Sequence, residues 1–202
     1  AEALAELTLE GRGVGLAWGG FNVSEGPTDN ATVDFELNPD NTITKFDTWQ
    51  DVGQGGDIGS LMVALEALKP MGVTPDRIRL VQSDTKLCPD SGMSAGSRSH
   101  YMNGHATQVA AEKFMNALRK PDGTYRTYDE LVKEGLPTKY RGRYESVVIS
   151  GLGRLDPNTG IGDPHPAYTY ILNLAEGEVN TKTGKTRVIR FTCVDEVGKV
   201  GN

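Results

Sequence analysis

Two short segments carry the residues best suited to chemistry, because each brings small residues directly before a predicted helix. The first contains Gly53, Gln54, Gly55 and Gly56, and the second contains Gly96, Ser97, Arg98 and Ser99. The first N–H groups of a helix have no partner within it and lie at the positive end of its dipole. A glycine-rich approach lets an anion come close to them. Each segment alone is also typical of an ordinary turn, but as a pair they predict a site for a long anionic ligand.

Composition limits what these segments can bind. The formal net charge of -6 over 202 residues argues against nucleic acid, because a phosphate backbone requires a basic face. An acidic chain must hold an anion with backbone N–H groups, hydroxyls and placed arginines, as in Ser97, Arg98 and Ser99. No apolar run approaches the roughly 20 residues of a membrane span. The two widely separated cysteines, Cys88 and Cys193, do not indicate a disulfide framework or a zinc site. We expect a cytoplasmic protein that binds neither nucleic acid nor membrane.

Two predicted helices should position the small-residue segments. Asp57 is the expected N-cap of a helix over 57–69, whose apolar residues recur at helical spacing at Ile58, Leu61, Met62, Leu65 and Leu68. A second amphipathic helix is predicted over 99–119, with the apolar stripe Met102, Ala106, Val109, Ala110, Phe114 and Ala117. This stripe indicates core packing. A short third helix is predicted over 128–134.

Alternating residues predict two hairpins, one over 32–37 and 42–47 and one over 167–180 and 186–195. Further strands are expected over 12–22, which is rich in glycine, and over 77–82. The predicted fold class is α+β, with a two-layer arrangement of a mixed β-sheet with hairpins packed against two main helices. We expect a single domain over 1–202 that is part of a larger protein. Residues 1–10 would be a helical or frayed lead-in, and 151–166 a long loop of the kind that carries function.

Two glycine patterns do not meet the requirements of known nucleotide motifs. Gly11, Gly13 and Gly15 are not followed by the last glycine of the dinucleotide fingerprint, because that position holds Leu16. The run 184–186 resembles the tail of a P-loop, but it lies in a predicted hairpin turn.

The three histidines do not indicate a metal site. His100 and His105 lie five residues apart on a predicted helix, which separates them by roughly 140° around its axis. They therefore cannot share one metal ion. His165 lies alone in a loop. We expect structural or solvated histidines, and no metal ligand from this chain.

Taken in order, the motifs resemble the molybdopterin-binding subunit of the xanthine oxidase family, in particular its bacterial aldehyde oxidoreductases. They are the segment 53–57 before a helix, Ser83-Asp84-Thr85 after a strand, the segment 94–99, and Asn103-Gly104 opening the next helix. The likeness runs from 12–18 to the late strand at 164–178, so it covers nearly all 202 residues.

The resemblance implies a molybdopterin cofactor, extended by cytosine dinucleotide, that carries molybdenum without a direct protein ligand. The implied cofactor-binding residues are Gly53, Gln54, Gly55, Gly56, Gly96, Ser97, Arg98 and Ser99. Glycine N–H groups would meet phosphate or pterin oxygens, and the Gln54 amide, the serine hydroxyls and Arg98 would add polar contacts. His165 departs from the family, whose members tend to carry an aromatic residue there, so a substrate-pocket role for its loop stays open.

The resemblance also implies parts outside this chain. Family members oxidise aldehydes or N-heterocycles with water, and their general-base glutamate is expected outside these residues, so none of them is assigned as catalytic. The expected partners are the remaining segments of the molybdenum subunit, and domains or subunits with [2Fe–2S] clusters. We expect the 202 residues alone to fold but neither to retain molybdopterin nor to oxidise aldehydes. Two alternatives remain open: a binding module for another anionic nucleotide, and a ligand-free interaction scaffold.

Overall fold

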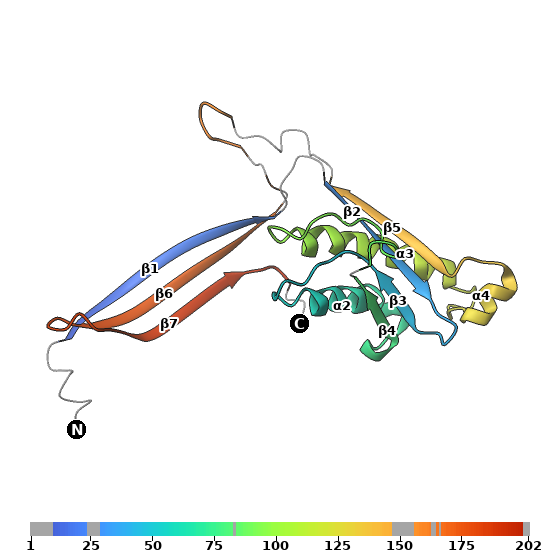
Figure 1. Ribbon diagram of the computed structural model, residues 1–202, viewed down its shortest axis with the longest axis horizontal. Helices are drawn as coiled ribbons and strands as arrows, with labels where there is room; N and C mark the ends of the chain where they lie inside the picture. The colour runs from blue at the N-terminus through green and yellow to red at the C-terminus, as the bar shows by residue number, and fades with distance from the viewer. Residues whose placement is uncertain are drawn as a thin grey trace, which may run out of the picture. The chain divides into compact units, whose positions relative to one another are not determined.

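The computed structural model describes residues 10–23, 29–82, 84–146, 156–162, 165 and 167–199. Backbone contacts divide these residues into two compact units. One unit contains the chain up to Phe21 and again from Ala167, and the other contains the chain from Asn22 to His165. Whether the two form one domain, as the sequence predicts, stays a prediction. The helices of the larger unit and the strands of both are labelled in Figure 1.

The larger unit is built on a four-stranded sheet with the order β4-β3-β2-β5. Its strands are β2 (Asp29–Leu37), β3 (Ile43–Phe46), β4 (Ile78–Val81) and β5 (Lys139–Ser146). β2 pairs antiparallel with both β3 and β5, whereas β3 pairs parallel with β4. The expected mixed sheet and its first hairpin are therefore confirmed. β5 is a strand that the sequence patterns did not predict.

Two helices pack on this sheet, as predicted. They are α2 (Gly56–Ala67) and α3 (Gly104–Leu118), and α3 is preceded by one π-helical turn, η3 (Ser99–Asn103). Single 3-10 turns, η1 (Lys69–Met71) and η2 (Pro75–Arg77), join α2 to β4. The short helix α4 (Tyr128–Glu134) begins with a capping box from Thr127 and Glu130.

The predicted apolar face of α2 is partly wrong. The side chain of Ile58 is 60% exposed, whereas Ser60 and Ala64 are fully buried. Small residues line the buried side because α2 lies close to α3 and to the indole of Trp49, which leaves no room for larger ones. Close packing has therefore overridden the hydrophobic periodicity.

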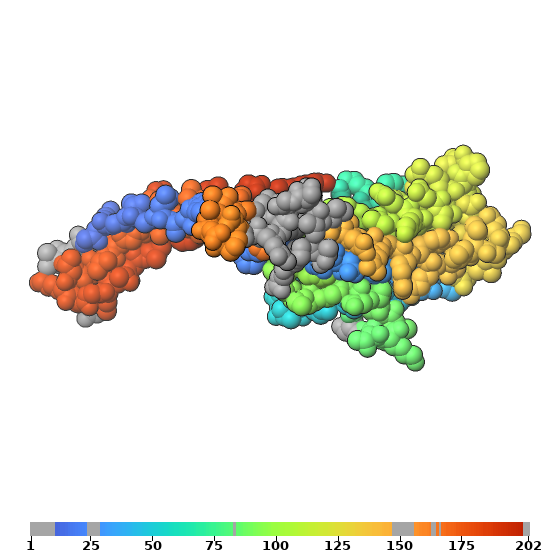
Figure 2. Space-filling model, turned by 90° about the horizontal axis from the view of Figure 1, so that it is seen from above, coloured from blue at the N-terminus to red at the C-terminus, as the bar shows by residue number. Residues whose placement is uncertain are grey.

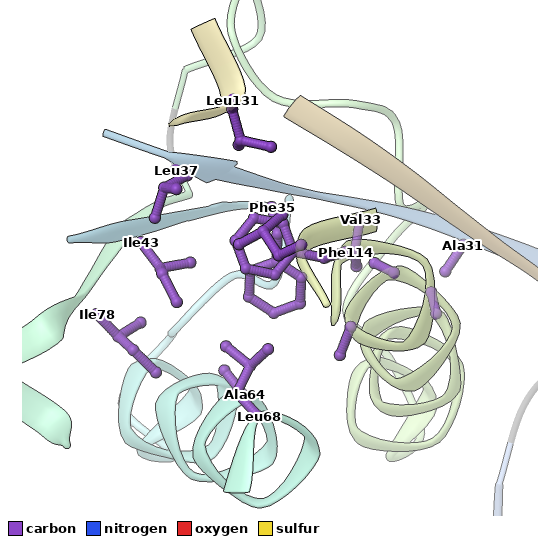
Figure 3. Packing of buried hydrophobic residues seen from close by; sticks show 14 of the residues in the cluster. Ala31, Val33, Phe35, Leu37, Ile43, Ala64, Leu68, Ile78, Phe114 and Leu131 are labelled. Carbon is purple, nitrogen blue, oxygen red and sulfur yellow. The ribbon is translucent and has the colours of Figure 1, made fainter. Parts of the chain in front are cut away.

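The core of the larger unit lies between the sheet and the two helices. In Figure 3 the labelled side chains of β2 and β3 point toward α2 and α3. The rings of Phe35 and Phe114 lie 5.9 Å apart at the centre of this cluster. β5 contacts α3 so closely that a Cβ atom at Gly142 would lie 2.2 Å from the Ala110 nitrogen. A glycine is therefore required at this point of the strand.

The smaller unit is a three-stranded sheet with the order β1-β6-β7. Its strands are β1 (Glu10–Val23), whose last two residues belong to the larger unit, β6 (Ala167–Asn180) and β7 (Thr186–Glu196). The β6–β7 hairpin confirms the second predicted hairpin, with one irregularity at Glu176 and Gly177. The side chains of β7, in red, are open to view in Figure 2, and Phe191 is 61% exposed. The strands thus form two sheets rather than the one that the sequence suggested.

Some sequence predictions lie outside the described residues. These are residues 1–9 of the lead-in predicted over 1–10, whose last residue begins β1, and half of the loop over 151–166, of which 156–162 and 165 are described. Among the helices that the structure describes, none is both long and apolar enough to cross a membrane.

Candidate functional site

The first small-residue segment forms a tight loop before α2. Gly53 and Gly55 have φ values of 109° and 81°, a backbone conformation that side chains with a Cβ atom rarely adopt. Gly55 is the N-cap of α2, so the prediction that Asp57 caps the helix is wrong. The carboxylate of Asp51 takes this role instead, because it accepts from the backbone N–H groups of Gly53 at 2.7 Å and Asp57 at 3.2 Å. Part of the predicted anion site is thus filled by the protein's own carboxylate.

The Gln54 side chain holds this loop in shape. Its Nε2 donates to the Gln50 carbonyl at 2.8 Å, and its Oε1 accepts from the Val52 N–H at 2.7 Å. Beside it, a Cβ atom at Gly55 would meet no atom within 4 Å. The loop therefore presents open backbone at Gly55.

The second segment forms the loop that leads into η3. Gly96 and Ser97 have φ values of 50° and 59°. Ser97 is exposed, whereas Ser99 is buried at 7% exposure. Positive φ at a serine is uncommon and requires support from the surrounding structure.

A chain of hydroxyls and amides connects the two loops. The Ser94 hydroxyl donates to Gln50 Oε1 at 2.5 Å and lies 2.6 Å from the Ser99 hydroxyl. Because the single Ser94 proton is directed to Gln50, Ser99 must donate to Ser94. The Gln50 N–H also donates to Ser94 Oγ at 3.1 Å. These bonds fix the second loop against the first.

Arg98 lies beneath the second loop rather than open to solvent. Its Nε and Nη2 donate to the two carboxylate oxygens of Asp29 at 2.5 Å and 2.7 Å. Its remaining N–H groups donate to the backbone carbonyls of Ser91 at 2.7 Å, Met93 at 2.9 Å and Asn30 at 2.6 Å. A guanidinium has five N–H donors, so none is left for a phosphate in this arrangement. The geometry favours a role for Arg98 in holding the loop.

Both small-residue loops line one open pocket of about 460 Å³. Its lining residues are Trp49, Val52, Gln54, Gly55, Gly56, Gly59, Ser94, Ala95, Gly96, Ser97, Arg98, Ser99 and His100. The structure therefore brings together seven of the eight predicted residues, and the eighth, Gly53, belongs to the same loop. Trp49 and Gln50 were missed by the sequence analysis, since no motif marks them, and Ser94 lies in the segment 94–99 but was not among the predicted binding residues.

The three histidines contact different side chains. The ring of His100 lies edge-on to Trp49 with centroids 5.7 Å apart, and that of His105 stacks on Tyr144 at 4.5 Å. Nε2 of His165 lies 2.9 Å from Nδ2 of Asn22, which is within hydrogen-bond distance. In the part of the chain that the structure describes, no three His, Cys, Asp or Glu side chains form a metal-binding group.

The pocket fits a ligand that is held by polar contacts at its edges. Gly55 offers space that a Cβ atom would fill, and the exposed Ser97 provides a hydroxyl at the second loop. In η3, beyond the residues that line the pocket, the side-chain amide of Asn103 is buried with no hydrogen-bond partner among the described residues. An unpaired buried amide is costly and calls for a partner. Fold and site thus define a cofactor-binding module with two loops around one pocket.

Comparison with known proteins gives this module its family. All 202 residues match the profile of the molybdopterin cofactor-binding domain. The aldehyde oxidoreductase of Megalodesulfovibrio gigas is 40% identical over 191 residues, covering 95% of this chain and 21% of the relative. The gamma subunit of the 6-hydroxypseudooxynicotine dehydrogenase complex of Paenarthrobacter nicotinovorans is 27% identical, over 100% of this chain and 27% of that subunit.

Solved structures agree. The aldehyde oxidoreductase from Desulfovibrio gigas superimposes with a TM-score of 0.89 and 39% identity, over 100% of this chain and 22% of that one. A copper- and molybdenum-containing CO dehydrogenase shares the fold, with a TM-score of 0.67 at 18% identity. The chain belongs to the molybdopterin cofactor-binding domain family and spans about a fifth to a quarter of the relatives' length.

Proposed function

We propose that the pocket between the two loops holds the molybdopterin cofactor, and that the whole protein is a molybdenum hydroxylase that oxidises aldehydes or N-heterocycles with water. The observation that carries this proposal is the joining of both small-residue loops around one pocket. The identity of 40% to an aldehyde oxidoreductase supports the aldehyde class of substrate.

Within the pocket, each group has a distinct proposed role. The open backbone at Gly55 lets a flat ring system lie against the start of α2. Ser97 supplies a hydroxyl from the opposite loop, and Ser99 fixes that loop through Ser94. Gln54 and Arg98 act mainly by keeping the loops in shape, since their polar atoms bond within the protein.

The bound cofactor would supply the molybdenum at which oxygen transfer and electron uptake occur. The chain's own residues bind and orient it. We propose that the general-base glutamate lies in another segment of the protein. The carboxylates of Asp51 and Asp84 bond to backbone N–H groups of their own turns instead. The cytosine dinucleotide form of the cofactor, [2Fe–2S] clusters in other domains or subunits, and contacts to the rest of the molybdenum subunit belong to the same proposal. So does a cytoplasmic location, which suits the free thiols of Cys88 and Cys193.

The test compares two glycines of matched conformation. Gly55 and Gly123 have φ values of 81° and 86°, and a Cβ atom at either would meet no atom within 4 Å. Valine at either position strains the backbone similarly, but only Gly55 lines the pocket. Gly55→Val should remove molybdenum and pterin from the purified protein, whereas Gly123→Val should retain both. Full cofactor content in Gly55→Val would show that this loop is not the cofactor site.

A further inference from the structure

A charged pair occupies a core position of the four-stranded sheet. Lys45 of β3 pairs in register with Phe35 of β2, and both side chains are fully buried. The Nζ atom of Lys45 lies 2.8 Å from Oδ2 of Asp47, whose side chain is also fully buried. An apolar side chain would be the ordinary choice at such a position.

The pair is enclosed by a closed set of hydrogen bonds. Lys45 Nζ donates to the Ser60 hydroxyl at 2.7 Å and to the Ser60 carbonyl at 3.3 Å. That hydroxyl donates to Asp47 Oδ2 at 3.1 Å, and Gln82 Nε2 donates to Asp47 Oδ1 at 3.0 Å. All three ammonium donors therefore have acceptors, and β3 is tied to α2 through Ser60.

Stability alone does not account for this pair. Burial lowers the pKa of the Lys45 ammonium, and the charge of Asp47 opposes that effect. Well-packed apolar residues in place of a buried ion pair are often neutral or stabilising. A buried pair of this kind is better explained by conformational specificity, because it allows only one arrangement of the groups around it.

The neighbouring group that the pair specifies is Trp49. Its backbone N–H donates to Asp47 Oδ1 at 3.3 Å, and Lys45 Nζ lies 5.6 Å from the centre of its ring. Trp49 is 4% exposed, so its ring has little freedom to move.

Trp49 also contacts both walls of the cofactor pocket. A Cβ atom at Gly56 would lie 2.9 Å from the indole Nε1, and one at Gly59 would lie 3.3 Å from the ring. On the other side, the ring meets His100, which directly follows the second loop. Trp49 therefore sets the start of α2 and the beginning of η3 at a fixed separation.

We propose that Lys45 and Asp47 are positioning residues, which fix Trp49 as the spacer between the two loops and so set the width of the cofactor pocket. This inference rests on the proposed function of that pocket. It predicts that the pair matters for cofactor retention much more than for folding.

The experiment removes both charges together in the purified holoprotein. Lys45→Met with Asp47→Leu should leave the thermal unfolding midpoint close to wild type, yet retain about tenfold less molybdenum and pterin after dialysis. The matched control is Asp34→Asn with Arg141→Gln, which removes an ion pair of 2.7 Å from the same sheet outside the pocket lining. This control should retain the cofactor.

Trp49→Leu supplies an independent arm that leaves the ion pair intact. It should lower cofactor retention to a similar extent, and Trp49→Phe should largely restore it. Because the pair is proposed to act through Trp49, adding Lys45→Met and Asp47→Leu to Trp49→Leu should cause little further loss.

The outcomes separate the two proposals. If Gly55→Val loses the cofactor while the Lys45/Asp47 double variant keeps it, the positioning role is overturned and the site stands. If the double variant does not fold, wild-type retention by Trp49→Leu overturns the positioning role. If Gly55→Val itself keeps the cofactor, the proposed site fails first.

Discussion

The Arg98 guanidinium donates to both carboxylate oxygens of Asp29 across a separation of 69 residues. The side chains of Arg98 and Asp29 are 6% and 18% exposed, and Arg98 also bonds three backbone carbonyls. A Cβ atom at Gly92 would lie 2.4 Å from the guanidinium, so the loop closes directly over it. The second small-residue loop is therefore built around this pair.

The pair predicts the effect of Arg98→Ala. The variant should lose about 3 kcal/mol of unfolding free energy, because it leaves a largely buried carboxylate and several carbonyls without their donor. Urea unfolding measures this change. Asp29→Asn should also destabilise the loop, and both variants should lower the cofactor content of the purified protein. If Asp29→Asn left cofactor content unchanged while Arg98→Ala removed it, Arg98 would act on the cofactor directly.

The approach of β5 to α3 predicts a large effect at Gly142. Gly142→Ala should destabilise the protein by about 3 kcal/mol, because the new methyl group would overlap the α3 backbone at Ala110. The comparison is Gly104→Ala, where a Cβ atom meets nothing within 4 Å in a helical backbone. That variant should gain about 0.5–1 kcal/mol from helix propensity. Equal unfolding midpoints for the two variants would contradict the packing.

Asp51 should titrate at unusually low pH. The N–H groups of Gly53 and Asp57 bond its carboxylate and lower its pKa below the ordinary value of 3.8. A carboxyl group with a lowered folded-state pKa stabilises the fold above its unfolded-state pKa, and this contribution disappears as pH falls through the folded value. NMR titration of the Gly53 amide should therefore show a midpoint below 3.8, absent in Asp51→Asn. A midpoint at or above 3.8 would mean that Asp51 does not cap α2.

The raised pKa of Tyr144 should make the folded protein less stable at high pH. Burial and a hydrogen bond with Tyr101 raise its pKa to about 12, and the ring of His105 stacks against it. Between the ordinary value of 10.0 and about 12, the unfolded phenol loses its proton while the folded one keeps it, so stability falls as pH rises. Denaturant unfolding across this range should show the fall, and Tyr144→Phe should reduce it. An unchanged pH dependence in Tyr144→Phe would exclude this assignment.

Several features of the protein could be predicted from the sequence because they depend on local interactions. Alternating residues and turn-forming residues located both hairpins, and the apolar stripe of α3 located its buried face. The small residues before each helix likewise marked both loops of the pocket, since positive φ and close approach require such residues there.

Other features depended on contacts between distant segments. Periodicity placed Ile58 inside, and N-cap preference placed Asp57 at the helix start, but the packing of Trp49 and the hydrogen bond to Asp51 decided otherwise. The role of Arg98 was equally hidden, because Asp29, which neutralises it, lies on another element. The sequence analysis assigned no role to Lys45, because Asp47 and Ser60 surround its ammonium only in the folded protein. A residue's type and spacing thus determined the local backbone, whereas only the tertiary structure decided which partner each polar group meets, because those partners come from segments distant in sequence.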